Sequence, residues 1–399
     1  MDLFSFSDSA QSFKASEIRE LMKFANEPGI ITFAGGMPDA AHFPVKEVTS
    51  IINTWDEPRK RAAFQYGATD GYPSLLATLA KRMEKQGLSL EGQRIIITTG
   101  AQQGLFLVSE VLLNPGDVVI AESPSFIGAI AAFKSFQARI AWVALENDGI
   151  SIVETERTIR TLAAEGKKPK FIYTIPNFQN PAGITLSQEK RKQLLDLALA
   201  YGIPILEDDP YGELYYAGSA ADYRPIKALP KARECVLYLN TFSKILSPGM
   251  RLGWLTGCQD IINTIEVAKQ SVDACSSSYT QVIAHDYLEK GYVDGYVTAM
   301  RDIYREKCGA MLHALTKYMP QTASWSHPTG GFFIWITLPQ GVSALKLFEK
   351  TIARNVAFVT GHPFMPEGMG DGTIRLAFSN ASLREIDEGV RIIGDALKG

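Results

Sequence analysis

Short apolar runs alternate with amphipathic stretches along the chain from about residue 94 onward. Amphipathic stretches such as 101–113 and 187–202 lie between runs that are rich in Val, Ile, Leu and aromatic residues. Successive apolar positions are typical of strands that helices cover on both faces. The pattern therefore predicts an α/β fold with a mostly parallel, seven-stranded sheet flanked by helices. The seven strands are expected at 94–98, 118–122, 139–145, 170–175, 204–208, 235–240 and 252–257.

The connection between the last two runs differs from the others. It consists of residues 241–251 and contains Pro248 and Gly249. Such a segment is too short to hold a crossover helix between parallel strands. We therefore expect one antiparallel strand in the sheet.

Beyond Tyr279 the pattern changes to long helical stretches, followed by apolar runs at 330–338, 356–360 and 373–379 and a helix at 382–397. These elements predict a smaller α+β domain, which the N-terminal residues are expected to join. The predicted organisation is an N-terminal arm and part of the small domain at 1–58, a large domain at 59–290 and a small C-terminal domain at 291–399.

Charge and cysteine content exclude several classes of function. The 40 Lys and Arg residues against 43 Asp and Glu residues give a net charge of −3, which disfavours nucleic acid and anionic membranes as partners. No pair of the four cysteines has CxxC spacing, so neither a zinc ribbon nor a dithiol redox site is indicated. With no basic leader followed by an apolar stretch at the N-terminus, we expect a cytoplasmic protein.

The segment 240–254, NTFSKILSPGMRLGW, carries the most informative chemistry. Lys244 lies between two apolar runs, beside the hydroxyls of Thr241 and Ser243, and Arg251 follows seven residues later. Hydroxyls and a guanidinium suit a dianionic phosphate. A lysine beside such a site, at the end of a strand, indicates a Schiff base to a phosphorylated carbonyl cofactor. The alternative is a surface loop with an ordinary ion pair.

A cluster of acidic residues follows another predicted strand. Glu207, Asp208 and Asp209 lie where open α/β sheets bind their ligands. Buried carboxylates need a cationic partner, and a protonated pyridine nitrogen is one; Tyr211 is spaced to donate to a phenolate oxygen. The alternative, a Mg²⁺ site, is disfavoured because no Walker-type phosphate loop accompanies the cluster.

Two further segments each connect a predicted strand to the next element of the chain. The segment 175–183, IPNFQNPAG, has the composition of a turn, and a simple turn is the alternative to a binding loop. The segment 98–104, TTGAQQG, leads from a strand into a helix, whose first amides are able to hold a phosphate.

Together these segments resemble the fold-type I pyridoxal-5′-phosphate (PLP) enzymes, specifically the class I/II aminotransferases and their 2-aminoadipate/kynurenine aminotransferase-like subgroup. The resemblance covers about residues 13–397 and rests on SKxxxPGxR at 243–251, NPxG at 180–183 and DDxY at 208–211. Thr241 replaces a serine that is common in such segments, and the hydroxyl is retained.

The resemblance implies a set of cofactor contacts in the large domain. Lys244 would form an aldimine with PLP, and Asp208 would pair with the pyridinium nitrogen. Tyr211 and Asn180, which also borders the substrate, would bind the phenolate oxygen. Phe126 would stack on the ring, although core packing explains an aromatic residue there equally well. The implied phosphate ligands are Thr241, Ser243, Arg251 and the backbone at Ala101 and Gln102.

The resemblance also implies substrate contacts and a partner. Arg375 would clamp the substrate α-carboxylate, and Gly36 would approach the substrate closely. Tyr66 would border the substrate and reach the phosphate of the neighbouring subunit, which implies a homodimer with shared active sites. Ser16 and Arg19 would meet the distal end of the substrate. An N-cap role for Ser16 and a solvated position for Arg19 are the alternatives.

The leading interpretation is a PLP-dependent aminotransferase that works by a ping-pong cycle through Lys244. It would move an amino group between an L-amino acid (2-aminoadipate, aromatic or branched) and a 2-oxo acid such as 2-oxoglutarate. A β-lyase or decarboxylase on the same fold is the main alternative. An aminotransferase-like regulator is disfavoured, because about 15 residues precede the resemblance and the net charge is negative. The histidines lack HxxxH spacing, so no metal is expected.

Overall fold

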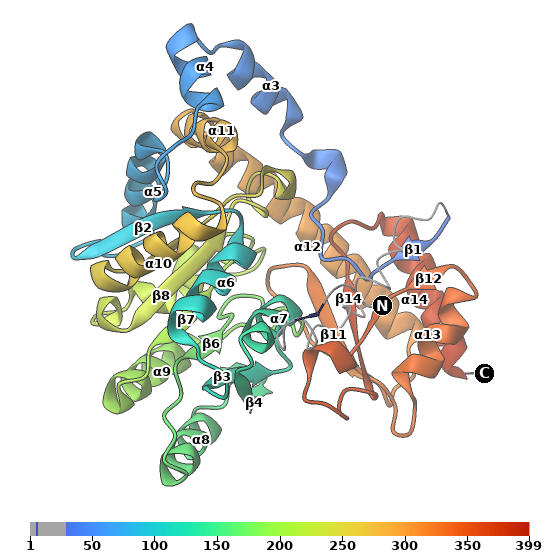
Figure 1. Cartoon of the computed structure of the whole chain (residues 1–399). Coiled ribbons are helices and arrows are strands. Elements are labelled where there is room, and N and C mark those ends of the chain that lie inside the picture. The colour runs from blue at the N-terminus through green and yellow to red at the C-terminus, as the bar shows by residue number, and fades with distance from the viewer. Residues whose placement is uncertain (1–4, 7–28, 399) are drawn as a thin grey trace.

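A mixed sheet forms the centre of the computed structural model, which describes residues 5–6 and 29–398 (Figure 1). The strands lie in the order β2-β9-β8-β7-β6-β3-β4-β5. Their bounds are β2 (Gln93–Thr98), β3 (Val118–Ser123), β4 (Arg139–Glu146), β5 (Gly149–Ile150), β6 (Ile172–Thr174), β7 (Ile205–Asp208), β8 (Val236–Thr241) and β9 (Gly253–Cys258).

The pairing of the strands confirms the predicted fold class. Strands β8, β7, β6, β3 and β4 pair in parallel, and β9 is antiparallel to both β8 and β2, as the short connection predicted. The sheet has eight strands rather than the predicted seven, because β5 pairs antiparallel with the end of β4. At two residues, β5 is too short to produce a hydrophobic pattern.

Helices cover both faces of this sheet. Ile96 packs with α6 (Ala101–Leu112), α7 (Ile127–Ser135) and α10 (Gln259–Val272) on one face. Its neighbour Ile97 packs on the opposite face with α5 (Pro73–Lys85), where α8 (Ile152–Ala164) and α9 (Gln188–Tyr201) cover the central strands. Helix α9 begins after its N-cap Ser187 and ends at Gly202, whose φ of +59° favours glycine.

A second, smaller sheet lies beside the first. It has the order β10 (Ser324–Trp325), β11 (Phe333–Thr337), β14 (Thr373–Ala377) and β13 (Val359–Thr360). Helices α13 (Ala344–Ile352) and α14 (Leu383–Lys398) lie with it. The predicted strand at 356–360 is divided, because β12 (Val356–Ala357) leaves this sheet to pair with β1 (Ile31–Thr32).

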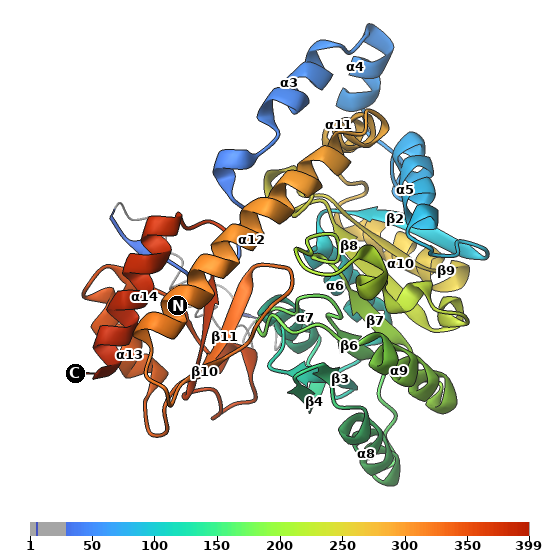
Figure 2. The same cartoon turned by 180° about the vertical axis from the view of Figure 1, so that it is seen from behind.

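Long helices connect the two sheets. Helix α12 (Tyr292–Tyr318) runs from the neighbourhood of α11 (Ser278–Glu289) to the smaller sheet (Figure 2). Helices α3 (Val45–Asn53) and α4 (Glu57–Phe64) pack beside α11.

The domain boundaries near 58 and 290 stay predictions. No helix in the described part of the chain is both long and apolar enough to cross a membrane. Short 3₁₀ helices occur at Ala40–His42, Ala220–Tyr223, Ile226–Ala228, Ala232–Glu234, Pro248–Met250 and His362–Phe364.

Candidate active site

A pocket of about 300 Å³ lies at the carboxyl edge of the main sheet, facing the smaller one. Strands β2, β3, β6, β7 and β8 run in one direction, so the segments that follow them meet at this edge. The structure brings most of the predicted site residues together in the pocket wall. These are Gly36, Ala101, Gln102, Phe126, Asn180, Asp208, Tyr211, Thr241, Ser243, Lys244, Arg251 and Arg375.

The remaining predicted residues do not line this pocket. Tyr66 is 87 % exposed on the surface, and Ser16 and Arg19 lie outside the described residues. The sequence prediction also missed part of the wall, because small or apolar residues at strand ends are indistinguishable from core. The missed residues are Ala34, Gly35, Ile127, Ile175, Pro210 and Phe333.

The turn between β2 and α6 forms an anion cradle with Arg251. Gly100, the N-cap of α6, has a φ of +80°, and a Cβ there would lie 2.7 Å from the Arg251 guanidinium. The guanidinium therefore lies against the first turn of the helix, where the backbone amides are free to bind an anion. The Thr241 and Ser243 hydroxyls, 2.9 Å apart, line the same pocket. This set of donors fits a phosphate group.

Lys244 directs its amine into the pocket from the end of β8. Its Nζ donates a hydrogen bond of 3.0 Å to the carbonyl oxygen of Gly36. Burial lowers the pKa of Lys244 to about 8, and the charges of Arg251 and Arg375 act in the same direction. A large fraction of the amine is therefore neutral near pH 8, and the neutral form is the one that attacks a carbonyl or accepts a proton.

Asp208 presents an unpaired oxygen at the end of β7. The residue is 2 % exposed, and its Oδ2 accepts a hydrogen bond of 2.9 Å from the Tyr173 hydroxyl. No described residue gives Oδ1 a hydrogen bond. Burial raises the pKa of Asp208 to about 7; the Tyr173 hydrogen bond opposes this rise. An orphaned, buried carboxylate oxygen in the pocket wall fits a cationic ring nitrogen.

The neighbouring acidic residues are engaged elsewhere. The Glu207 carboxylate accepts two backbone hydrogen bonds, of 2.6 and 2.8 Å, from the 226–228 helix. Asp209 accepts hydrogen bonds from the Asn177 amide at 2.9 Å and from the Tyr238 hydroxyl at 3.2 Å. Among the described residues, no three acidic, His or Cys side chains converge as metal ligands. Of the three predicted carboxylates, only Asp208 lines the pocket.

Arg375 is a buried cation in the opposite wall, on β14. It donates a hydrogen bond of 2.8 Å to Asn180 Oδ1 and another to the Ala34 carbonyl, and the Phe333 and Phe364 rings lie 4.5 and 4.9 Å from its guanidinium carbon. Burial lowers the pKa of Arg375 to about 10. Within the described chain its Nε is unpaired and no carboxylate forms an ion pair with it. The group therefore fits a carboxylate ligand.

Tyr211 completes the wall between Asp208 and Arg375. Its ring packs edge-on against Phe332 and Phe333, with centroids 5.3 and 5.9 Å apart. Burial raises the pKa of Tyr211 well above its ordinary value, and the positive charge of Arg375 opposes this rise. The hydroxyl therefore stays protonated near neutral pH and is available as a hydrogen-bond donor.

A larger cavity of about 780 Å³ lies on the other side of the segment that carries Asp208, beside α5 and α12. Of the predicted acidic cluster it contains only Asp209, and it contains none of the predicted cofactor and substrate ligands; Arg82 in its wall already forms ion pairs with Glu213 and Asp294. The smaller pocket is therefore the candidate active site, because it holds Lys244, the unpaired Asp208 oxygen and Arg375, which has no carboxylate partner in the described chain.

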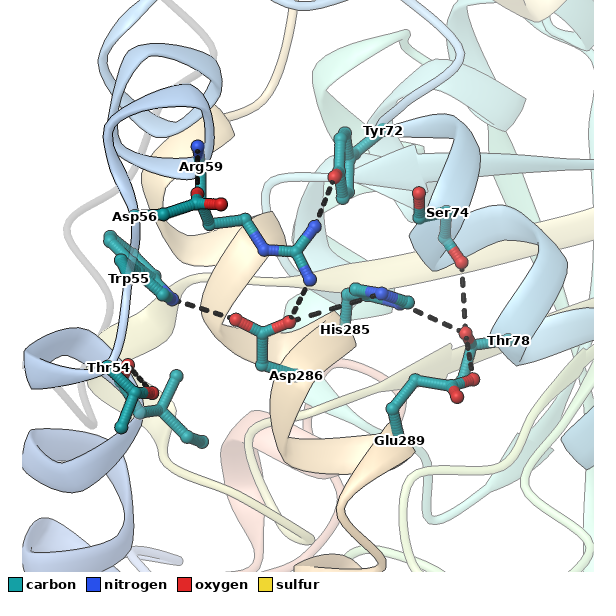
Figure 3. Close-up of polar contacts among 11 residues, drawn as sticks. Thr54, Trp55, Asp56, Arg59, Tyr72, Ser74, Thr78, His285, Asp286 and Glu289 are labelled. Carbon is teal, nitrogen blue, oxygen red and sulfur yellow. Dashed lines mark hydrogen bonds and ion pairs between the residues drawn. The ribbon is translucent and has the colours of Figure 1, made fainter.

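A buried polar network holds the segment that leads to Tyr66 against α11 (Figure 3). The Trp55 indole and the Arg59 guanidinium donate hydrogen bonds of 2.7 and 2.6 Å to the Asp286 carboxylate. Arg59 also donates to the Tyr72 hydroxyl at 2.8 Å. These contacts fix both ends of the 65–71 loop, in which residues 65–68 are exposed, so Tyr66 extends from an anchored base.

Replacing Asp286 with alanine is expected to lower the free energy of unfolding by about 1–3 kcal/mol, because the buried Trp55 N–H and Arg59 lose their acceptor. Chemical denaturation measures the change. Asp294→Ala is the matched control: this exposed carboxylate also pairs with an arginine, Arg82, and its loss is expected to cost less than about 1 kcal/mol. Equal effects of the two substitutions would contradict an anchoring role for Asp286.

Comparison with known proteins identifies a family and several relatives. The family model described as aminotransferase class I and II matches residues 28–393. An aromatic-amino-acid aminotransferase of Thermococcus litoralis is 40 % identical over 98 % of this chain and 94 % of its own length. A 2-aminoadipate transaminase of Thermus thermophilus is 37 % identical over 99 % and 96 %.

A solved structure agrees with these matches. The crystal structure of a kynurenine aminotransferase from Pyrococcus horikoshii, in complex with PMP, superposes with a TM-score of 0.95. It is 40 % identical to this chain and covers 98 % of it, while the chain covers 96 % of that structure.

Proposed function

The chain belongs to the class I and II aminotransferases, whose cofactor is pyridoxal phosphate, and on this premise we propose a specific reaction and specific roles for the residues of the pocket. We propose that the enzyme transfers an amino group between an L-amino acid (2-aminoadipate, aromatic or branched) and a 2-oxo acid such as 2-oxoglutarate. The observation that carries the proposal is the convergence in one pocket of the Lys244 amine, the unpaired Asp208 oxygen and the Arg375 guanidinium, whose Nε has no partner among the described residues.

The residues present fit the cofactor at both of its charged ends. The Gly100–Arg251 cradle, with Thr241 and Ser243, would hold the phosphate, and Asp208 Oδ1 would hold the protonated ring nitrogen. When bound, pyridoxal phosphate supplies an electron sink for the pair of electrons left at the substrate Cα. Phe126 would cover the ring, and Tyr211 with Asn180 would donate to its phenolate oxygen.

The chain's own groups orient the substrate and move its proton. Arg375 binds the α-carboxylate and so sets the direction of the Cα–H bond. The Lys244 amine would accept the substrate Cα proton at its Nζ and would hold that proton until it is returned. Its lowered pKa suits this work, because an acid–base group is most effective when its pKa lies near the working pH. The same groups then act in reverse on the 2-oxo acid.

The wall of the pocket supports aromatic and apolar substrates. Ile127 and Phe333 line it beside Arg375. The cations of the described wall are Lys244, Arg251 and Arg375, and all have a proposed role, so a distal carboxylate has no cation left there. An acidic substrate would therefore need Arg19. The names of the relatives, aromatic and 2-aminoadipate aminotransferases, support both classes of substrate.

Spectral titration of the holoenzyme with amino donors tests this function. Phenylalanine, leucine and 2-aminoadipate are expected to bleach the visible cofactor band, and a 2-oxo acid is expected to restore it. Arg19→Ala is expected to weaken 2-aminoadipate and 2-oxoglutarate by roughly 10- to 150-fold, the value of one charged hydrogen bond, and to leave phenylalanine unaffected. Equal losses for all donors would contradict a role for Arg19 at the distal end.

The principal alternative is a β-lyase. It predicts ammonia and pyruvate from a β-substituted amino acid, without any need for a 2-oxo acid. If these products are released as fast as the donor is consumed, the enzyme is a β-lyase and the proposed transfer reaction is wrong. Arg375 is compatible with both reactions, so the products decide between them.

We propose that the enzyme is a cytoplasmic homodimer with shared active sites. Tyr66 is 87 % exposed, although it extends from a loop whose two ends are anchored by Arg59, Tyr72 and Asp286. An exposed aromatic ring on an anchored loop supports a contact with a second copy of the chain.

The four cysteines, all free thiols, support a reducing compartment.

Mixing inactive Tyr66→Ala and Lys244→Ala variants is expected to restore part of the activity. A hybrid dimer would contain one site with both native side chains, because each site would take Tyr66 from one subunit and Lys244 from the other. Activity is measured after subunit exchange has been verified by mass spectrometry. No recovery despite exchange would mean that each site is complete within its own chain.

A further inference from the structure

Asp208 has a single hydrogen-bond donor among the described residues, and that donor comes from a neighbouring strand. Tyr173 on β6 donates from its hydroxyl to Asp208 Oδ2 at 2.9 Å. Its ring is completely buried and packs edge-on against Phe133, with the centroids 5.4 Å apart. The hydroxyl therefore has no access to water, and the carboxylate is its acceptor.

Because of this contact, the two carboxylate oxygens of Asp208 have different surroundings. Oδ2 is taken by Tyr173, whereas Oδ1 has no partner in the described part of the chain and belongs to a residue of the pocket wall. A carboxylate with one oxygen fixed cannot rotate freely about its Cβ–Cγ bond. Oδ1 is thus kept directed away from β6, the strand whose Tyr173 binds Oδ2.

The Tyr173 hydrogen bond favours the ionised form of Asp208, whereas its other surroundings oppose ionisation. Glu122 on β3 and Asp209, directly after β7, are buried acids whose charges repel that of Asp208, and Tyr211 is a neutral neighbour. Burial and the charge of Asp209 both raise the Asp208 pKa, and the Tyr173 hydrogen bond lowers it. A donor to one oxygen stabilises the ionised form that a ring cation needs.

We propose that Tyr173 is a positioning residue, which orients Asp208 and keeps it ionised so that the cofactor ring nitrogen stays protonated. Tyr173 lies behind the carboxylate, outside the pocket wall, and acts through it. The inference rests on the role proposed for Asp208, and it adds a residue that read as ordinary strand core in the sequence.

Tyr173→Phe tests the proposal, because it removes the hydroxyl and keeps the ring. With cofactor labelled at the ring nitrogen, ¹⁵N NMR of the holoenzyme is expected to show a smaller protonated fraction at each pH than in the unchanged enzyme. The kcat is expected to fall roughly 10- to 150-fold, the value of one hydrogen bond to a charged group. The KM for the amino donor should stay within about twofold, since Arg375 is untouched.

Tyr238→Phe is the matched control. Tyr238 is also a buried tyrosine that donates to a carboxylate of the same segment, Asp209 Oδ2 at 3.2 Å, but Asp209 does not line the pocket. Its loss is expected to leave the ¹⁵N signal and kcat unchanged. An equal effect of both substitutions would show general loosening of the core, and would overturn the proposal.

A double-mutant cycle separates positioning from folding. If Tyr173 acts through Asp208, adding Tyr173→Phe to Asp208→Asn should lower kcat by less than about twofold further. A full additional loss in the double variant, or an unchanged ¹⁵N signal in Tyr173→Phe, overturns the inference. These outcomes differ from failure of the proposed role of Asp208, which would appear as normal turnover in Asp208→Asn alone.

Discussion

Replacing Lys244 with alanine is expected to abolish turnover, with a loss of at least about 10⁴-fold, because one positioned acid–base group alone contributes roughly 10²–10⁴. The substitution also removes the amine that is proposed to attach the cofactor. The cradle at Gly100 and Arg251 and the Asp208 carboxylate are retained, so the cofactor is expected to bind noncovalently and to dialyse away more readily. Steady-state assays and absorption spectra of the same preparation measure both effects.

The Lys244→Arg variant tests whether activity needs only a positive charge at this position or the reactive amine of lysine. The guanidinium keeps the positive charge beside Gly36 but stays protonated and cannot attack a carbonyl, so this variant is expected to be as inactive as the alanine variant. Borohydride reduction of the unchanged enzyme, followed by peptide mass spectrometry, should place the cofactor on Lys244. A modified peptide that carries another lysine would refute the assignment.

The parts of the candidate site that follow strands could be predicted from the sequence. Strands buried on both faces produce continuous apolar runs, and the polar residues after them, such as Asp208 and Lys244, are conspicuous by contrast. The carboxyl ends of parallel strands lie at one edge of the sheet. Residues that follow successive apolar runs in the sequence are therefore neighbours in space. The one short connection, at 241–251, was enough to predict the antiparallel strand β9.

Features that depend on packing between distant segments left no such signal. Tyr173 and Ile175 belong to the mostly apolar run 171–175 and read as core, although the Tyr173 hydroxyl donates to Asp208 and Ile175 lines the pocket. The division of 356–360 between β1 and β14 depends on the N-terminal segment and not on local sequence. The contact proposed for Tyr66 is with a second chain, so neither the hydrophobic pattern nor the structure of one subunit specifies it.

Asp208→Asn is expected to lower kcat by about 10²–10³, the usual effect of removing a preorganised electrostatic contact to the reacting group. The amide is nearly the same size and still accepts the Tyr173 hydrogen bond, so the fold should be retained. It has no charge to keep the ring nitrogen protonated, and the electron sink is weakened in every half-reaction. The same factor is therefore expected for aromatic and acidic donors, measured in single-turnover reactions.

The choice of Asp208 over its neighbours follows from where each carboxylate finds its donors. Glu207 is bound by two backbone amides, and Asp209 by Asn177 and Tyr238, whereas Asp208 keeps one oxygen unpaired in the pocket wall. Asp209→Asn should thus reduce stability more than turnover, the reverse of Asp208→Asn. Near-normal turnover in Asp208→Asn, with a large loss in Asp209→Asn, would transfer the ring-nitrogen role to Asp209.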